Sequence, residues 1–503
     1  MKKKSVILIS MLLISTAIFA QEQMDALRFS RNDLFGTARS MSMGGAFGAL
    51  GGDQTGVSIN PAGIAIYRSS EIAGTFGLMR TTATVGDERN HRTSFDMDNI
   101  GFVAYMPLRS AAMPFINFGF SMNRQKSFNR RIEGAGVIYH SLLDFAAVQS
   151  TVNGLTPAQL NIENPFRSQL WLPTFANDAG LIIHQGGQWL AVNDGGESPF
   201  SQFEVSERGN IDNFAFSMGT TINNVLSIGA AVNVKTVSYR FSSFYDEDFT
   251  NGWLTLRNAL SIDGAGASGR FGIIYRPIHE VRIGVSYHTP TWLSLSQTYS
   301  ARMDDDMEFY SGEAPGHLET GRFGSDFDLR TPGRWVFSLA TVLNNNFILS
   351  ADYEIMNYRT MEFAGRRNFN APNKWIQEDF RTTSTVRLGM EYRFTPQFSG
   401  RLGYAWMQNP NTDAFRRKAN PGIPGSNSIF RVEGDTNFFT AGLGYRFSRT
   451  FFVDFALVYK VQTDDLYAFP NWWTDTGFHL VNSTPFELRN TSWRSVLTLG
   501  YRF

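Results

Sequence analysis

Cysteine is absent from the 503-residue sequence, so the chain has no disulfide framework, no thiolate metal site and no cysteine nucleophile. Net charge is absent too, because 45 basic residues balance 45 acidic ones. A nucleic-acid-binding protein needs a basic surface that neutralises phosphates, so this class is excluded. Charged residues make up 18% of the chain, against about a quarter in soluble domains. The composition therefore predicts exposed apolar side chains, whereas a mean hydropathy of −0.20 is too polar for a bundle of membrane helices.

The first twenty residues predict export. Three lysines at positions 2–4 precede an apolar stretch at 6–19, and Ala20 is a small residue suited to cleavage before Gln21. This order is typical of a secretory signal peptide over residues 1–20, and the apolar stretch is short for a membrane span. The alternative is a retained membrane anchor. No run of 18 or more apolar residues follows Gln21, so no transmembrane helix is expected after it.

From about Glu71 onward, apolar and polar side chains alternate, which is the pattern of strands with one apolar face. In one example the polar face carries charge at Asp454 and Lys460, and the apolar face carries Phe451, Val453, Phe455, Leu457 and Tyr459. Fourteen such segments are expected, at 71–85, 94–106, 113–124, 211–222, 225–241, 262–275, 280–299, 328–343, 346–361, 381–394, 397–409, 436–447, 450–462 and 491–503. An even number is what a closed antiparallel barrel requires.

The connections between these segments support a membrane barrel. Every second connection is short and holds turn residues, as at 223–224 (Asn-Asn), 344–345 (Asn-Asn) and 448–449 (Ser-Arg). The intervening connections are mostly long, the longest at 125–210, where Thr156-Pro157 is suited to begin a loop helix. A soluble sandwich or a propeller would also alternate, but it would bury its apolar rows. We therefore predict an all-β fold, a 14-stranded antiparallel transmembrane β-barrel over residues 71–503.

Residues 21–70 differ from the barrel. Eight glycines lie between positions 36 and 63, which is too many for a stable helix or strand. The stretch has no Gly-Lys-Ser/Thr phosphate loop and no preceding strand, so it is not a nucleotide site. A disordered linker is the alternative, but linkers rarely carry so many large apolar residues, here Met41, Met43, Phe47 and Leu50. We predict a compact plug inside the barrel.

The residues from Gly36 to Phe47, with the sequence GTARSMSMGGAF, and Asn60-Pro61-Ala62 resemble the N-terminal hatch of the FadL/TodX-type hydrophobic-compound channels of Gram-negative outer membranes. The resemblance extends to the strand count and to the terminal Gly-Tyr-Arg-Phe. It implies that the hatch closes the barrel and that hatch residues 60–62 touch the wall near a kinked strand. It also implies that the hatch shifts to release ligand sideways through the wall. Gly44 and Gly45 belong to the same expected gate. By the same resemblance, the aromatic residues Tyr501 and Phe503 form the signal that the outer-membrane assembly machinery recognises.

Ligand contacts are expected from the plug and from the lumen. We predict that the apolar side chains of Met41, Met43, Phe47 and Leu50 contact the ligand, and that Arg282 and Arg334 bind a ligand carboxylate. The alternative for the arginines is an ion-pair network that braces the plug. Strand parity places charged residues and one histidine in the lumen: Lys235, Arg270, Arg282, His288, Arg334, Asp352, Glu354, Arg387, Glu391, Arg393, Arg401, Arg446, Asp454 and Arg494.

These patterns predict a monomeric outer-membrane channel for passive, hatch-gated uptake of hydrophobic small molecules such as long-chain fatty acids. A general porin, or a receptor for a ligand such as haem, is the alternative. The seven histidines are scattered without metal-ligand spacing, and no Gly-x-Ser-x-Gly elbow is present, so we expect no enzyme, metal or cofactor. The expected partners are the hydrophobic ligand, outer-membrane lipid and, during biogenesis, the assembly machinery.

Overall fold

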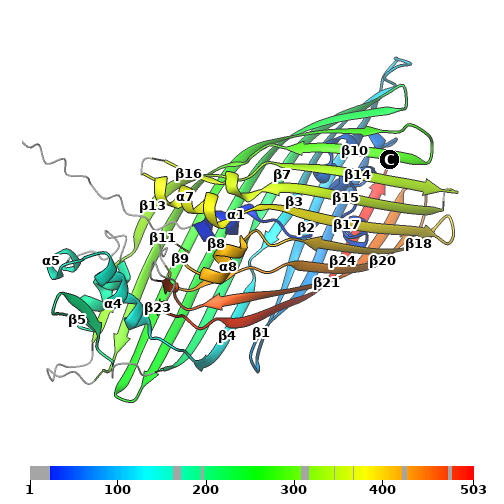
Figure 1. Ribbon diagram of the computed structural model, residues 1–503. Coiled ribbons are helices and arrows are strands. Elements are labelled where there is room, and N and C mark those ends of the chain that lie inside the picture. Colours follow the sequence, from blue (N-terminus) through cyan, green and yellow to red (C-terminus); the bar gives the residue numbers. More distant parts are fainter. Residues whose placement is uncertain are drawn as a thin grey trace, which may run out of the picture.

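The computed structural model describes residues 23–161, 171–193, 198–307, 316–344, 346–365, 368–421, 427–473 and 479–503 (Figure 1). The expected signal peptide at 1–20 lies outside the described residues. The strands form an elongated barrel with short turns at the end nearest the C-terminus and long loops with helices at the other. We call these the turn end and the loop end.

The barrel wall consists of fourteen antiparallel strands, five of them interrupted, which confirms the predicted fold. The first strand pairs with both the second and the last, so the sheet closes on itself. The wall strands are β1 (Glu71–Val85), β2 (Glu88–Pro107), β3 with β4 (Phe115–Ser127, Arg130–Val137), β7 (Phe200–Ile222), β8 (Leu226–Phe249), β9 (Gly252–Tyr275), β10 with β11 (Val281–His288, Trp292–Asp305), β13 with β14 (Phe323–Arg330, Arg334–Leu343), β15 with β16 (Phe347–Asn357, Glu362–Ala364), β17 (Thr382–Arg393), β18 (Phe398–Met407), β19 with β20 (Phe430–Val432, Thr436–Arg446), β21 (Phe451–Tyr467) and β24 (Phe486–Arg502).

Three segments predicted as continuous strands are interrupted. The segment 280–299 breaks between β10 and β11 at Pro290, and the segment 328–343 breaks between β13 and β14 at Pro332. Proline has no backbone N–H for the ladder, which explains both breaks. The segment 346–361 ends its strand at Asn357 and continues as a short 3-10 helix, η3 (Tyr358–Thr360).

Strands β7, β8 and β9 are longer than predicted, with 23, 24 and 24 residues. Residues 200–210, 242–249 and 252–261, which were expected in connections, are therefore strand, and the longest connection shrinks to 138–199. In the loop half of β9, Leu256 and Ile262 are buried inside the barrel, whereas Arg257 and Asp263 are exposed. This half lacks the outward apolar row on which the prediction rested.

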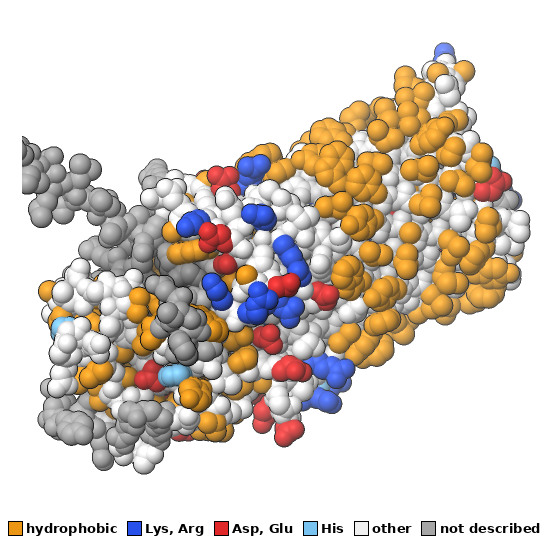
Figure 2. Space-filling model, in the orientation of Figure 1, with side chains coloured by type: hydrophobic (Ala, Val, Ile, Leu, Met, Phe, Trp, Pro, Cys, Tyr) orange, Lys and Arg blue, Asp and Glu red, His pale blue; other side chains and the backbone are white. Residues whose placement is uncertain are grey.

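On the face shown in Figure 2, apolar side chains cover the turn half of the barrel, and charged side chains gather beyond them toward the loop end. The outward rows predicted from the sequence are exposed, for example Phe271 and Ile273 on β9 and Trp335 and Phe337 on β14. Exposed aromatics also lie beside the short turns: Tyr392, Phe394, Tyr445, Phe447, Tyr501 and Phe503. Among the described residues, no helix is long and apolar enough to cross a membrane.

The short turns have the backbone expected of tight hairpins. Asn223, Asn224 and Asn344 have φ angles of 48°, 55° and 48°, in the left-handed region that asparagine tolerates best after glycine. Asn345 lies outside the described residues.

Helices and hairpins from the connections cover an apolar core at the loop end. Helix α4 (Leu142–Val152) begins with a capping box of Ser141 and Asp144, and α5 (Pro157–Leu160) begins at Thr156-Pro157 as predicted. This core also includes the N-terminal helix α1 (Gln23–Ser30). The other elements of the loop end are α6 (Trp171–Asp178), β5 (Ile182–Gln185), β6 (Gln188–Ala191), β12 (His317–Glu319), α7 (Asn370–Asp379), α8 (Asp413–Lys418), β22 (Trp472–Trp473) and β23 (His479–Val481).

The hatch segment, residues 31–70, lies inside the turn half of the barrel (Figure 1). It contains α2 (Ala38–Ser42), α3 (Gln54–Ile59) and the 3-10 helix η1 (Pro61–Ile66), so the expectation that its glycines exclude helices is wrong. Each helix has a capping side chain, Thr37, Asp53 and Asn60 respectively, that accepts a backbone N–H of its first turn. Capping and packing against the wall stabilise helices that glycine content alone disfavours.

Candidate functional site

The hatch segment packs directly on a belt of wall glycines. At each belt position an added Cβ atom would lie less than 3.0 Å from a hatch atom, so a larger residue there would push the hatch away. The belt runs over nine strands and consists of Gly101, Gly119, Gly219, Gly229, Gly272, Gly284, Gly389, Gly403 and Gly442. The missing side chains let the hatch backbone lie against the wall.

The motif residues of the hatch lie on this belt. The Asn60 side-chain amide donates to the carbonyl oxygens of Gly48 (2.7 Å) and Ile273 (3.1 Å), and its oxygen accepts the Ala62 N–H (3.1 Å). Pro61 begins η1, and its carbonyl faces Gly229 of β8, while Ala62 is fully buried. The motif thus fixes one side of the hatch to β8 and β9.

The predicted gate glycines lie on the opposite wall. Gly44 and Gly45 have φ angles of 63° and 76°, which favour glycine. A side chain on Gly44 would meet the backbone of Leu388 and Tyr404 on β17 and β18.

Ion pairs brace the hatch further. Arg39 contacts Glu391 at 2.9 Å, Glu391 also contacts Arg401 at 2.8 Å, and Arg401 contacts Asp454 at 2.5 Å. Asp352 accepts the backbone N–H groups of Phe47 and Gly48. Within the hatch, burial raises the pKa of Asp53, which caps α3. The lumen charges therefore serve largely as the bracing network that was the alternative interpretation of the arginines.

Most of the predicted ligand residues are packed rather than open to a cavity. Met41, Met43, Phe47 and Leu50 are at most 3% exposed and pack in two small clusters between hatch and wall. Arg282 donates to the Leu50 carbonyl oxygen at 2.9 Å and lines none of the cavities described below. Of the predicted ligand residues, Arg334 lines one of these cavities, the inner cavity.

Three cavities lie in series along the described hatch and α1. The outer cavity lies beside α1 and is lined by Met24, Leu27 and Phe241, among others. The middle cavity shares Lys126, Phe128 and Arg130 with the outer one. The inner cavity shares Asn32, Asp33, Phe35 and Met407 with the middle one. Together they form a row from the loop end to the hatch.

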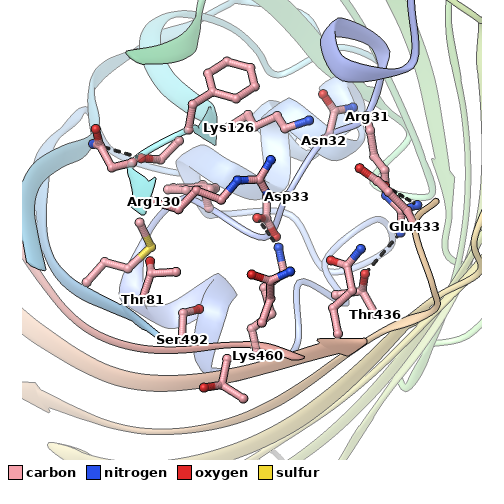
Figure 3. Close-up of a pocket in the computed structure, with 18 of the residues that line it drawn as sticks. Arg31, Asn32, Asp33, Thr81, Lys126, Arg130, Glu433, Thr436, Lys460 and Ser492 are labelled. Atoms are coloured by element: carbon pink, nitrogen blue, oxygen red, sulfur yellow. Dashed lines mark hydrogen bonds and ion pairs between the residues drawn. The ribbon is translucent and has the colours of Figure 1, made fainter. Parts of the chain in front are cut away.

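The middle cavity is rich in charge (Figure 3). Lys460 Nζ contacts Asp33 Oδ2 at 2.6 Å, and Arg31 contacts Glu433 at 2.8 Å. Burial alone would raise the pKa of Asp33, but the charge and hydrogen bond of Lys460, the Leu34 N–H and the charge of Lys126 together more than offset this, so the pKa lies below its usual value. Asp33 is thus a carboxylate at neutral pH.

Sequence reasoning missed these residues, although a signal was present. The chain has eight lysines, three of them at 2–4, and two of the remaining five, Lys126 and Lys460, line the middle cavity.

The inner cavity meets the wall where strand pairing stops. Strands β2 and β3 pair up to Asn99 and Asn123, and beyond that point β2 pairs with β1 and β4 pairs with β7. We call this unpaired stretch of the described wall the seam. Asn123 and Arg124 line the inner cavity. Arg124 closes the seam through ion pairs with Asp96 of β2 and, at 3.0 Å, with Asp212 of β7.

A bulge in β2 links the seam to the hatch. The register of β1 and β2 shifts at Thr75, which turns Asp98 inward onto Arg494 of β24. The Arg494 guanidinium in turn lies 3.7 Å from the ring centre of Phe35 in the hatch segment. A movement of residues 31–36 would therefore reach the edge of the seam.

Within the described residues, no group of three or more His, Asp or Glu side chains has the geometry of a metal site.

Comparison with known proteins agrees with this architecture. None of the curated proteins compared matches the sequence. Among solved structures, a FadL homologue from Pseudomonas aeruginosa superposes with a TM-score of 0.54 at 13% identity, covering 94% of this chain and 99% of that one. The toluene transporter TbuX from Ralstonia pickettii (TM-score 0.50, 15% identity, 94% and 99% covered) and TodX from P. putida (0.50, 12%, 94% and 99%) are also similar. At these identities the likeness shows the fold.

A family profile described as outer membrane protein transport protein (OMPP1/FadL/TodX) matches residues 204–503, more than half of the chain. The chain therefore belongs to this FadL/TodX family of outer-membrane transport channels for hydrophobic compounds, which are not enzymes.

Proposed function

We propose that this protein mediates passive, hatch-gated uptake of elongated amphiphiles with an acidic head, such as long-chain fatty acids. The observation that carries the proposal is the inner cavity, which is lined by three arginines, Arg124, Arg334 and Arg387, and reaches the seam in the wall at Arg124. A ligand would enter among the long loops on the cell surface, pass α1 and leave sideways into the membrane. Exposed apolar side chains beside the seam, including Phe95 and Met97, suit a lipid environment.

The charge of the inner cavity favours an acidic ligand. Arg334 and Arg387 share one carboxylate, Glu354, at 3.2 and 3.0 Å. In the described structure, Nη1 of Arg387 is buried without a hydrogen-bond partner. Guanidinium groups bind carboxylates strongly, so a fatty-acid head would complete this site. A neutral aromatic such as toluene makes no use of these charges. Because TbuX and TodX are toluene transporters, a monoaromatic ligand is the second candidate.

Arg334→Gln tests the choice between these ligands. Glu354 keeps Arg387 as its partner in this variant, so no buried charge is stranded. We expect dodecanoate to bind about tenfold more weakly, as for the loss of one charge-assisted hydrogen bond of roughly 1.5–3 kcal/mol, and dodecanol to bind unchanged. Calorimetric titration in a non-ionic detergent measures both. Equal affinity of wild type and variant for dodecanoate, or tight binding of toluene alone, would favour the second candidate.

The proposal also covers export, gating, oligomeric state and assembly of the barrel. We propose that residues 1–20 direct export, that residues 21–70 act as the gate through the motif 60–62, and that the barrel works as a monomer. We also propose that Tyr501 and Phe503, both exposed at the turn end, are read by the outer-membrane assembly machinery. A general porin is disfavoured because the hatch, with its ion pairs and the glycine belt, fills the turn half of the lumen.

A further inference from the structure

A short extended stretch of the chain separates the middle cavity from the inner one. Residues 31–37 connect α1 to α2, and Asn32, Asp33 and Phe35 line both cavities. We call residues 31–35 the partition. If the partition moved aside, the two cavities would join.

Side chains rather than a regular backbone ladder hold the partition in place. Asp33 contacts Lys460, and Arg31 contacts Glu433 and donates to the Thr436 hydroxyl at 3.1 Å. One backbone bond, from the Asp33 N–H to the Gln125 carbonyl oxygen at 2.9 Å, joins the partition to β3. Removing the contact between Asp33 and Lys460 would therefore take away a large share of what holds the partition.

Two lysines, Lys126 and Lys460, lie beside Asp33, and Asp33 is the one carboxylate of the described structure that either of them contacts. Lys126 Nζ donates to the Arg28 carbonyl oxygen at 2.8 Å, and no carboxylate of the described residues lies within ion-pair distance of it. Lys460 has Asp33 as its one carboxylate partner in the described structure. The charge of Lys126 also acts on Asp33, and both lysines flank it in the cavity (Figure 3). We call Lys126 and Lys460 the cationic cradle; Asp33 is paired with Lys460, and Lys126 is left without a carboxylate partner among the described residues.

We propose that Asp33 is an internal substitute for the acidic head of the ligand. An incoming acidic head replaces Asp33 on Lys460 and also binds Lys126, the partition is released, and the middle and inner cavities join. Lys126 has no carboxylate of the described residues within ion-pair distance before the exchange, so afterwards the two lysines together balance two acids, the ligand head and the released Asp33. The proposal rests on the proposed function, and it explains how the arrival of a ligand opens its own path. A carboxylate or a phosphate head would both fit the cradle.

Asp33→Asn tests the competition. The substitution keeps the shape of the side chain and removes the charge that competes with the ligand. We expect dodecanoate to bind about tenfold more tightly, because the binding-competent state no longer has to displace an ion pair, and dodecanol to bind unchanged. Asp25→Asn is the matched control, since it makes the same charge change in α1 but lines neither the outer nor the middle cavity. Dodecyl phosphate, titrated in parallel, shows which acidic head the cradle prefers.

Lys460→Met provides the second arm. It removes the charge of Lys460 from the cradle and should weaken dodecanoate binding. When Lys460→Met is already present, adding Asp33→Asn should no longer strengthen binding.

A third readout uses the absence of cysteine from the chain. In an Asn32→Cys variant, dodecanoate should raise the rate at which a small maleimide modifies the thiol, whereas dodecanol should not.

The outcomes separate the two proposals. If wild-type protein binds dodecanoate but Asp33→Asn binds it with equal affinity, Asp33 does not compete with the ligand and the inference is wrong, while the proposed function stands. If the wild-type protein binds neither dodecanoate, dodecyl phosphate nor dodecanol, the proposed function itself fails.

Discussion

Joining residues 96 and 124 with a short bis-maleimide, after both are replaced by cysteine, is expected to reduce dodecanoate uptake to the level of membranes without the protein. Asp96 and Arg124 face each other across the seam, where β2 and β3 no longer share backbone hydrogen bonds. Lateral exit requires these strands to separate. A covalent bridge prevents the separation, whereas the native ion pair can open. Uptake into outer-membrane vesicles, followed with labelled dodecanoate, measures the effect.

Two controls make the cross-link informative. The double-cysteine protein before cross-linking lacks the ion pair, so its uptake should equal or exceed that of wild type. A second pair, Phe102→Cys and Phe120→Cys, bridges positions that are register partners below the seam, where the strands are already hydrogen-bonded. Cross-linking this pair should leave uptake unchanged. Unimpaired uptake through a protein bridged at 96 and 124 would rule out exit through the seam.

Gly272→Ala is expected to produce a leaky channel with a lower unfolding temperature. A Cβ atom on Gly272 would lie 1.9 Å from Oδ1 of Asn60 and 2.9 Å from Cδ of Pro61. Asn60 and Pro61 must therefore move away from β9. Overpacking of this kind costs about 1–3 kcal/mol. The barrel strands keep their ladder hydrogen bonds, so the protein should still assemble. Single-channel conductance in planar bilayers and thermal unfolding of the purified protein measure the two effects.

Gly74→Ala is the matched control for this variant. Gly74 lies on β1 in the same barrel wall, and nothing lies within 4 Å of the position that its Cβ atom would take. Its conductance and unfolding temperature should equal those of wild type. If Gly272→Ala behaves like Gly74→Ala, contact between the Asn60-Pro61 motif and the wall does not keep the hatch closed.

The membrane-facing half of the barrel could be predicted from the sequence because its strands and turns are each marked by residues within the same short segment. Each strand there carries an outward apolar row, and each tight turn has its own residues, such as Asn223-Asn224. The loop half escaped prediction because its apolar side chains face inward, as Leu256 does, and its outer face is polar. Pro290 and Pro332 are present in the sequence, but the alternation of apolar and polar residues on both sides of each proline predicted continuous strands.

The candidate site depends on contacts between distant parts of the chain. Asp33 and Lys460 are 427 positions apart, and neither is unusual in its own segment. The seam depends on where pairing of β2 and β3 stops, which no local pattern encodes. Conversely, Met41, Met43 and Phe47 have the composition expected of a ligand pocket, but close packing between hatch and wall leaves them buried.

Identification of the lipid that co-purifies with the protein directly tests whether the channel carries acidic amphiphiles. The protein, extracted from outer membranes in a non-ionic detergent, is analysed by native mass spectrometry, and the bound molecules are then extracted and identified. We expect an acidic, long-chain amphiphile bound to wild type and a reduced amount bound to Arg334→Gln. Protein that is consistently empty and conducts ions through an open pore would contradict it and would indicate a general porin.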